Sequence, residues 1–231
     1  MIAWLTGDRP FPPVERALRS PNGLLAAGGS LTAPRLLEAY RSGIFPWFNA
    51  GEPVLWWSPD PRMVLIPGEF KVSRSLARIL HKGGHEVRCD TAFEQVMRGC
   101  AAPRSGQDAT WIGEDMVSAY CALHHLGYAH SVETWVDGEL VGGLYGVSIG
   151  RMFYGESMFS RVSNASKIAL AHLCKQLERW QFGMIDCQMK TPHLSTLGAR
   201  EITRSKFLAS VQELVHYAPI TEWQLDHHLF T

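Results

Sequence analysis

The sequence predicts an α+β fold in which a small N-terminal α/β domain, residues 1–60, precedes a larger mixed-sheet domain, residues 61–231. The first sixty residues are rich in proline, glycine and aromatic side chains, and Pro59 and Pro61 form a reasonable domain boundary. From Arg62 onward, strand-like and helix-like segments alternate regularly. In that part, three strand-like segments in hairpin order precede a long amphipathic helix, a strand and a final helix. This order is typical of a mixed sheet with helices packed on it.

The N-terminal domain is expected to contain one helix, around residues 33–42. Leu36 and Tyr40 share one face of that segment at helical spacing. The stretches on either side, residues 21–32 and 43–62, are broken by glycine and proline and are expected to be loops.

The larger domain has clearer periodicity. The dipeptide Asp137-Gly138 is a hairpin turn signal between two strand-like runs, and the apolar stripe of residues 164–182 predicts a long helix. The succession is also the order of elements in the acetyltransferase-like (GNAT) core. Strands are expected at 63–67, 85–90, 130–136, 139–150, 151–159 and 184–188, and helices at 73–83, 91–101, 113–127, 164–182 and 206–215.

Composition excludes several classes of protein. Lys and Arg total 22 and Asp and Glu total 22, so a globally basic nucleic-acid binder is excluded, although a local basic patch is not. The longest apolar run falls short of the roughly 18 to 20 residues that span a bilayer, so no membrane association is expected. The five cysteines are odd in number and form no CxxC pair, which favours reduced thiols in the cytoplasm over a disulfide framework.

Tryptophans cluster in the region expected to be loop-like. Trp47, Trp56 and Trp57 either fill the thin core of a small domain or offer one ring on which a nucleobase stacks. Trp111 invites the second interpretation too, because it follows the polar loop 102–110 and precedes a helix start.

A local basic patch lies on the helix expected at residues 73–83. Arg74, Arg78 and Lys82 recur at i, i+4 and i+8, so one helix face carries all three. The face is either simply solvated or contacts a phosphate backbone.

Two carboxylates fall in apolar strands, where burial costs free energy unless the charge is paired. Alternation along a strand predicts that Asp186 and Gln188 project from the same face and that Ile185 and Cys187 project from the other. Asp186 either pairs with a nearby arginine or serves as a general base or amine-orienting group with Gln188 as its neutral companion. Glu156 raises the same question.

Other motifs fail on inspection. Ser157 lacks the second glycine of a nucleophile elbow, and the adjacent histidine pairs at 124–125 and 227–228 diverge too much to chelate a metal alone. The glycines between 142 and 150 lie in a hairpin strand, so they indicate a bulge or close approach by a ligand rather than a phosphate loop. Alternation turns Cys187 away from Asp186, which disfavours a thiol nucleophile.

Eleven short motifs occur in order between about Pro21 and Phe207 and together resemble the leucyl/phenylalanyl-tRNA–protein transferase family. GESMFSR and LWWSPDPR are distinctive by themselves. The full set is PNGLLAAGGSL, GIFPWF, LWWSPDPR, SRSL, TWI, AHSVETW, ELVGGLYGV, GESMFSR, NASK, IDCQ and LGA.

The resemblance implies an aminoacyltransferase of the N-degron pathway. Such enzymes move Leu or Phe, and less well Met, from an aminoacyl-tRNA to the α-amino group of proteins that begin with Arg or Lys, which are then degraded. It also implies a small N-terminal domain before a GNAT-like domain, no cofactor and no metal. We further expect a cytoplasmic monomer.

The resemblance implies roles for particular residues. Asp186 and Gln188 match the paired active-site positions, and Glu156 matches a carboxylate beside the aminoacyl group. Trp47 and Trp111 match the residues that hold the 3′-terminal adenosine of tRNA. The helix that carries Arg74, Arg78 and Lys82 matches the one that contacts the tRNA backbone. The aminoacyl side-chain pocket is expected to comprise Leu144, Phe153, Met158, Leu170, Leu173 and Ile185.

Two other functions stay open at this point. An acyl-CoA-dependent N-acetyltransferase would need a glycine-rich pyrophosphate loop before the long helix, and residues 159–164 offer no glycine. A non-catalytic tRNA-binding module would leave the carboxylates in apolar strands unexplained.

Overall fold

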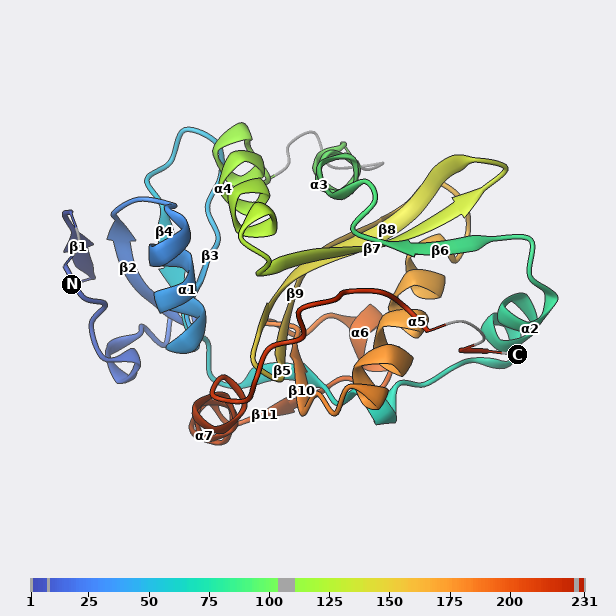
Figure 1. The fold of residues 1–231 in the computed structure, drawn as a ribbon. Helices are drawn as coiled ribbons and strands as arrows, with labels where there is room; N and C mark the ends of the chain where they lie inside the picture. The colour runs from blue at the N-terminus through green and yellow to red at the C-terminus, as the bar shows by residue number, and fades with distance from the viewer. Residues whose placement is uncertain (1, 8, 104–110, 227–228, 231) are drawn as a thin grey trace.

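A computed structural model of the chain describes residues 2–7, 9–103, 111–226 and 229–230. Most of the polar loop expected at 102–110 and the His227-His228 pair lie outside the described residues. Two sheets organise the molecule, a small one near the N-terminus and a large one that occupies the rest (Figure 1). The fold is α+β, as the sequence predicts.

The small sheet has four short strands in the order β1-β2-β4-β3. Strand β1 is parallel to β2, and the other pairs are antiparallel. Helix α1 begins after Thr32 and packs beside the sheet in Figure 1. The elements are β1 (Ala3–Leu5), a 3-10 turn (Val14–Arg16), β2 (Leu24–Gly28), α1 (Ala33–Arg41), β3 (Phe45–Pro46) and β4 (Leu55–Trp57).

The large sheet has seven strands in the order β11-β5-β10-β9-β8-β7-β6. Strands β10 and β9 are parallel, and every other neighbouring pair is antiparallel, so the sheet is mixed. The strands are β5 (Arg62–Leu65), β6 (Glu86–Cys89), β7 (Ala129–Val136), β8 (Glu139–Ile149), β9 (Met152–Ser160), β10 (Met184–Asp186) and β11 (Arg200–Ile202).

Helices cover both faces of the large sheet. Helices α3 and α4 lie on one face and α5 lies on the other (Figure 1). None of the helices in the described ranges is long and apolar enough to cross a membrane. The remaining elements are a 3-10 turn (Pro67–Glu69), α2 (Arg74–Lys82), α3 (Phe93–Ala101), α4 (Glu114–His125), α5 (Ala165–Arg179), α6 (Pro192–Thr196) and α7 (Arg204–Leu214).

The expectation that residues 21–32 and 43–62 are loops is wrong, because these stretches contain β2, β3 and β4. Strands of two to five residues broken by glycine and proline show too few alternations to be recognised. Trp56 is fully buried in β4, and its indole N–H donates to the Gly28 carbonyl oxygen at 2.8 Å. Trp56 therefore fills the core of the small sheet. Helix α6 and strand β11 were likewise not expected.

Glycines in β8 serve packing and a bulge. A Cβ added at Gly142 would lie 2.4 Å from the Ala165 Cβ on α5, and one at Gly146 would lie 2.3 Å from the Tyr154 carbonyl oxygen. The register between β8 and β9 shifts at Tyr145 and Gly146. The bulge interpretation is confirmed at this position, and the close approach is made by the protein's own atoms.

The hairpin turn is confirmed. Asp137 and Gly138 connect β7 to β8 with φ angles of 51° and 79°, the left-handed values that a two-residue turn of this kind requires. The turn sets the register between β7 and β8. Strand β8 also pairs with β9, and the candidate site lies against β8 and β9.

Candidate active site

The six residues expected to form an aminoacyl side-chain pocket all line one cavity of about 460 Å³. Strands β8, β9 and β10 supply one wall and helix α5 supplies another. All six side chains are apolar; they are Leu144, Phe153, Met158, Leu170, Leu173 and Ile185. Such a cavity can hold a small apolar side chain without leaving polar groups unpaired.

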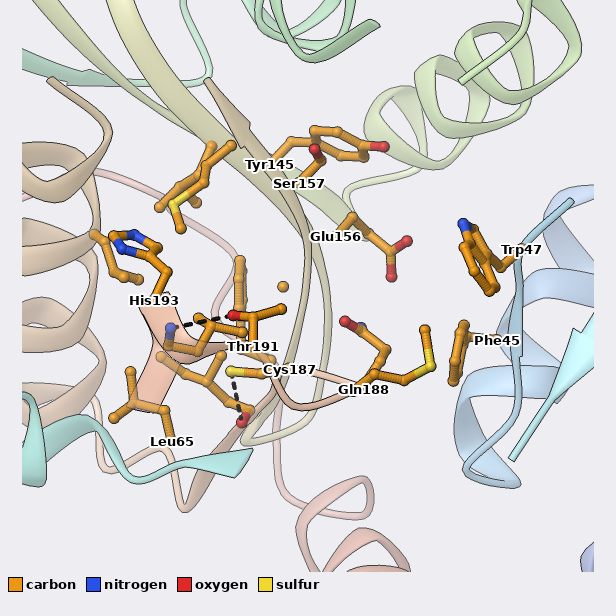
Figure 2. Close-up of a pocket in the computed structure, with 18 of the residues that line it drawn as sticks. Phe45, Trp47, Leu65, Tyr145, Glu156, Ser157, Cys187, Gln188, Thr191 and His193 are labelled. Carbon is orange, nitrogen blue, oxygen red and sulfur yellow. Dashed lines mark hydrogen bonds between the residues drawn. The ribbon is translucent and has the colours of Figure 1, made fainter. Parts of the chain in front are cut away.

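Trp47 and Trp111 line the same cavity. Trp47 follows β3 and is 38% exposed, and its carbonyl oxygen accepts a 2.7 Å hydrogen bond from the Trp57 indole N–H. Trp111 is partly buried and lies shortly before α4. Among the three tryptophans of the N-terminal cluster, Trp56 and Trp57 are therefore core residues, and Trp47 presents its ring to the cavity (Figure 2).

Glu156 on β9 faces the cavity beside Trp47 (Figure 2). Tyr40 of α1 donates a 2.7 Å hydrogen bond to its Oε1, and Tyr120 of α4 donates a 3.1 Å hydrogen bond to its Oε2. The two tyrosine hydroxyls also contact each other. Two helices that are distant from β9 in the sequence thus hold one carboxyl group in place.

The Glu156 carboxyl is poised to change protonation near neutral pH. Burial raises its pKa from the usual 4.5 to about 7, although the Tyr40 and Tyr120 hydrogen bonds act in the opposite direction. Burial and then the Glu156 charge raise the pKa of both tyrosines well above the ordinary value, so both hydroxyls stay protonated and donate. A carboxyl with this pKa can accept or release a proton at physiological pH.

Gln188 also lines the cavity, but Asp186 does not. The prediction that the two project from one strand face is wrong, because β10 ends at Asp186 and Gln188 has a left-handed φ of 55°. This turn places Gln188 in the cavity together with Ile185 and Cys187. The Gln188 side-chain nitrogen is buried and has no hydrogen-bond partner among the described residues.

Asp186 is fully buried and forms a two-pronged ion pair with Arg62 of β5. Arg62 Nε lies 2.8 Å from Oδ1, and Arg62 Nη2 lies 2.6 Å from Oδ2. The Gln188 backbone N–H also donates to Oδ1 at 2.9 Å. Of the two roles left open for Asp186, this geometry favours pairing with an arginine, and its role in catalysis stays a prediction.

Cys187 is a poor nucleophile in this position. Burial, followed by the Asp186 charge, raises the pKa of its thiol, which therefore stays protonated near neutral pH. Its Sγ points back to the Ile185 carbonyl oxygen (Figure 2).

The basic side chains of α2 do not line the cavity. Arg74, Arg78 and Lys82 are exposed, as expected, and no ion pair within the described ranges involves them. Helix α2 packs against α5, which supplies one wall of the cavity. Contact between α2 and nucleic acid stays a prediction.

The structure adds residues that sequence reasoning did not single out. Tyr40 and Tyr120 hold Glu156, and His193 of α6 lines the cavity on the side away from Trp47 (Figure 2). Arg62 is the ion-pair partner of Asp186. The sequence pointed to such a partner only indirectly, because a buried carboxylate without one costs free energy. No local pattern marks the tyrosines, because each looks like an ordinary core aromatic on its helix.

The mixed sheet and its cavity define an α+β protein with an apolar binding site that ends in a carboxyl group. The family model described as leucyl/phenylalanyl-tRNA protein transferase matches residues 64–212, and the model for the N-terminal domain of that family matches residues 29–60. The chain belongs to this family.

Curated relatives cover nearly the whole chain. The leucyl/phenylalanyl-tRNA–protein transferase of Nitrosospira multiformis is 64% identical, and the match covers 98% of each chain. The one from Chromobacterium violaceum is 61% identical over 99% of this chain and 97% of that one. Among solved structures, that of L-PGS from Bacillus licheniformis is similar with a TM-score of 0.43 and 10% identity, over 80% of this chain and 71% of that one.

Proposed function

We propose that this protein transfers leucine or phenylalanine from an aminoacyl-tRNA to the α-amino group of proteins whose first residue is Arg or Lys. Membership of the leucyl/phenylalanyl-tRNA–protein transferase family supports the reaction class. The single structural observation that carries the proposal is one cavity that combines an apolar slot, two tryptophans and a carboxyl with a pKa of about 7.

The cavity suits an aminoacyl-adenosine. Its apolar wall accepts the side chain of Leu or Phe, whereas a charged side chain would lose hydration without gaining a partner. Trp47 and Trp111 line the same cavity, and an exposed indole can stack against any nucleobase, so we assign both rings to the 3′-terminal adenine. The ester carbonyl would then lie near Glu156 and Gln188.

The chemistry needs alignment and the movement of one proton. The acceptor nitrogen attacks the ester carbonyl carbon, the bond from that carbon to the ribose oxygen breaks, and the proton lost by the amine ends on the ribose hydroxyl. An aminoacyl ester is already activated, so positioning and oxyanion stabilisation suffice. We assign Glu156 to exchange the proton with the amine and the Gln188 amide to donate a hydrogen bond at the ester.

The rest of the tRNA is expected to extend along α2, where Arg74, Arg78 and Lys82 meet the phosphate backbone. All five cysteines lie in the described ranges and no disulfide joins any of them, which supports a cytoplasmic protein. In that compartment the added residue marks the acceptor for degradation through the N-degron pathway. We expect the enzyme to act as a monomer.

Acyl-CoA-dependent acetyl transfer is the competing function on the same architecture. It would need free backbone N–H groups at the start of α5 for the pyrophosphate. The Ser166 backbone N–H instead donates to Ser160 Oγ at 2.9 Å, and the Ala165 N–H donates to the Val162 carbonyl oxygen at 3.2 Å. These contacts occupy donors that a pyrophosphate would require, so aminoacyl transfer is favoured.

The deciding experiment follows labelled leucine from Leu-tRNA to a protein that starts with Arg, beside a matched protein that starts with an acidic residue. We expect label on the Arg protein alone, and at least a tenfold lower rate for Glu156→Gln. Label on both acceptors would overturn the acceptor rule. Bound tRNA without any transfer would favour a binding-only protein, and the absence of both would reject the proposal.

A further inference from the structure

Arg62 joins three parts of the protein at one buried guanidinium. Its side chain is fully buried, and Nε and Nη2 engage the two oxygens of Asp186 at 2.8 and 2.6 Å. The third nitrogen, Nη1, donates to the Gly43 carbonyl oxygen at 3.1 Å. The rings of Phe45 and Phe207 lie 4.7 and 4.5 Å from the guanidinium carbon.

The contact with Gly43 reaches the part of the cavity that Phe45 and Trp47 line, which we call the Trp47 wall. Gly43 precedes β3 by two residues, and Phe45 of β3 and the following Trp47 both line the cavity (Figure 2). One guanidinium on the large sheet thus holds both the carbonyl before β3 and a ring within it.

The contact with Asp186 reaches Gln188, which also lines the cavity. The Asp186 Oδ1 that accepts from Arg62 also accepts the Gln188 backbone N–H at 2.9 Å. The Met63 N–H, next to Arg62 in the chain, donates to the Gln188 carbonyl oxygen at 3.1 Å. These bonds hold Gln188 at its left-handed φ of 55°, a conformation that non-glycine residues adopt only when the surroundings enforce it.

We propose that Arg62 is a positioning residue that fixes the distance between the Trp47 wall and the Gln188 amide. The assignment rests on the proposed aminoacyl transfer. Arg62 touches no cavity space itself and acts through Asp186, Gly43 and Phe45. A buried ion pair alone is weak evidence for stability, since apolar pairs often replace one without loss. The planar fork, with a separate contact for each nitrogen, is what a geometric role requires.

The test is Arg62→Lys, which keeps the positive charge and loses the fork. Single-turnover transfer of leucine from Leu-tRNA to an Arg-starting protein separates two quantities: the amplitude reports the competent fraction, and the rate constant reports geometry. We expect the rate constant to fall at least tenfold while the amplitude stays within twofold of wild type. A lower amplitude with an unchanged rate constant would make Arg62 merely structural and overturn the proposal.

Glu133→Gln is the matched control. Glu133 is fully buried and accepts hydrogen bonds from Thr91, Ala92, Ser131 and Trp135, and it does not line the cavity. Its loss should lower the melting temperature and leave the rate constant within twofold of wild type. A tenfold fall in this control as well would show that loosening any part of the core slows transfer, and would overturn the special role of Arg62.

Phe207→Leu covers the case in which Arg62→Lys does not fold. It leaves the ion pair intact and removes one of the two rings beside the guanidinium. We expect a rate constant about threefold lower, and an unchanged rate constant would overturn the assignment. Wild-type protein that transfers no leucine would overturn the proposed function and this assignment with it. Active wild type together with an Arg62→Lys variant that keeps the wild-type rate constant would overturn the assignment alone.

Discussion

Glu156 owes its raised pKa to burial, which outweighs two tyrosine hydrogen bonds that favour the ionised form. The folded state therefore holds the proton up to a pH of about 7, whereas an unfolded glutamate releases it near 4.5. Between these two values the folded state binds more protons, so this group lowers the free energy of unfolding as the pH rises.

We expect Glu156→Gln to become more stable relative to wild type between pH 5 and pH 8, because glutamine cannot ionise. The relative gain should reach at most about 3 kcal/mol, from roughly 1.4 kcal/mol per pKa unit. Urea unfolding at several pH values measures it. Glu139→Gln, which removes an exposed carboxylate beside the hairpin turn, is the control for the loss of one acidic group. A flat difference for Glu156→Gln would contradict the raised pKa.

Trp111 tests stacking at the cavity. If its ring holds the terminal adenine, Trp111→Ala should weaken binding of uncharged tRNA by about 1 to 3 kcal/mol, which is typical of a base on an aromatic ring. Trp4→Ala removes an equally large ring that is 61% exposed and lies outside the cavity, and it should bind tRNA normally. Filter binding measures the tRNA affinity of both variants. If Trp111→Ala binds tRNA as tightly as wild type, Trp111 is a packing residue and does not stack on the adenine.

At the scale of elements, α2 shows how a sequence pattern becomes a surface. Leu76 and Leu80 are buried, which turns Arg74, Arg78 and Lys82 outward together. Ser73 caps the helix, and its hydroxyl accepts the Leu76 N–H at 3.2 Å. The result is a regular row of cations in a protein with no net charge.

Replacing Arg74 and Arg78 with alanine should weaken tRNA binding and reduce the salt slope of log K by about 1 to 2, because each released phosphate contact contributes roughly one unit. The matched control replaces Arg98 and Lys175 with alanine, which removes the same number of positive charges. Both side chains already form ion pairs within the protein, Arg98 with Glu94 and Glu114 and Lys175 with Glu178. Its salt slope should match wild type. An unchanged slope in the α2 variant would leave this face simply solvated.

The packing of β8 on α5 depends on a missing side chain. Gly142→Ala would place a Cβ 2.4 Å from the Ala165 Cβ, so helix and strand must separate. We expect a loss of about 1 to 3 kcal/mol in the free energy of unfolding, measured by urea denaturation. Gly138→Ala tests a glycine of different kind, since its Cβ meets open space and only its φ of 79° is strained. A neutral Gly142→Ala would show that α5 shifts freely.

At the scale of the whole molecule, the two sheets share one core. The largest cluster of buried side chains runs from Leu36, Tyr40 and Trp57 at the small sheet to Tyr154 and Phe207 at the large one. The Tyr154 hydroxyl donates to the Tyr40 carbonyl oxygen at 2.9 Å across the same boundary. The predicted division at residues 60 and 61 separates two sheets in the chain, and the side chains across it pack together.

Thermal unfolding should therefore be a single cooperative transition, with calorimetric and van't Hoff enthalpies equal. Differential scanning calorimetry measures both. Two separate transitions would contradict a shared core and would instead make the small sheet an independent folding unit.

Local patterns of the sequence determined a large part of this protein. Helical periodicity placed α1, α2 and α5 within a few residues, and the Asp137-Gly138 turn defined the β7–β8 hairpin. The resemblance to the transferase family singled out the six apolar residues that line the cavity. Ordered short motifs were sufficient to indicate the family.

Only the tertiary structure decided what surrounds the polar groups. Gln188 lines the cavity and Asp186 does not, because Gln188 adopts a left-handed φ after β10 ends. The alternation pattern of a strand does not predict such a turn. Glu156 meets Tyr40 and Tyr120 from positions 116 and 36 residues away, and Asp186 meets Arg62 from 124 residues away. Burial and hydrogen bonding set the charge of a carboxyl, and both depend on groups that come together only when the chain folds.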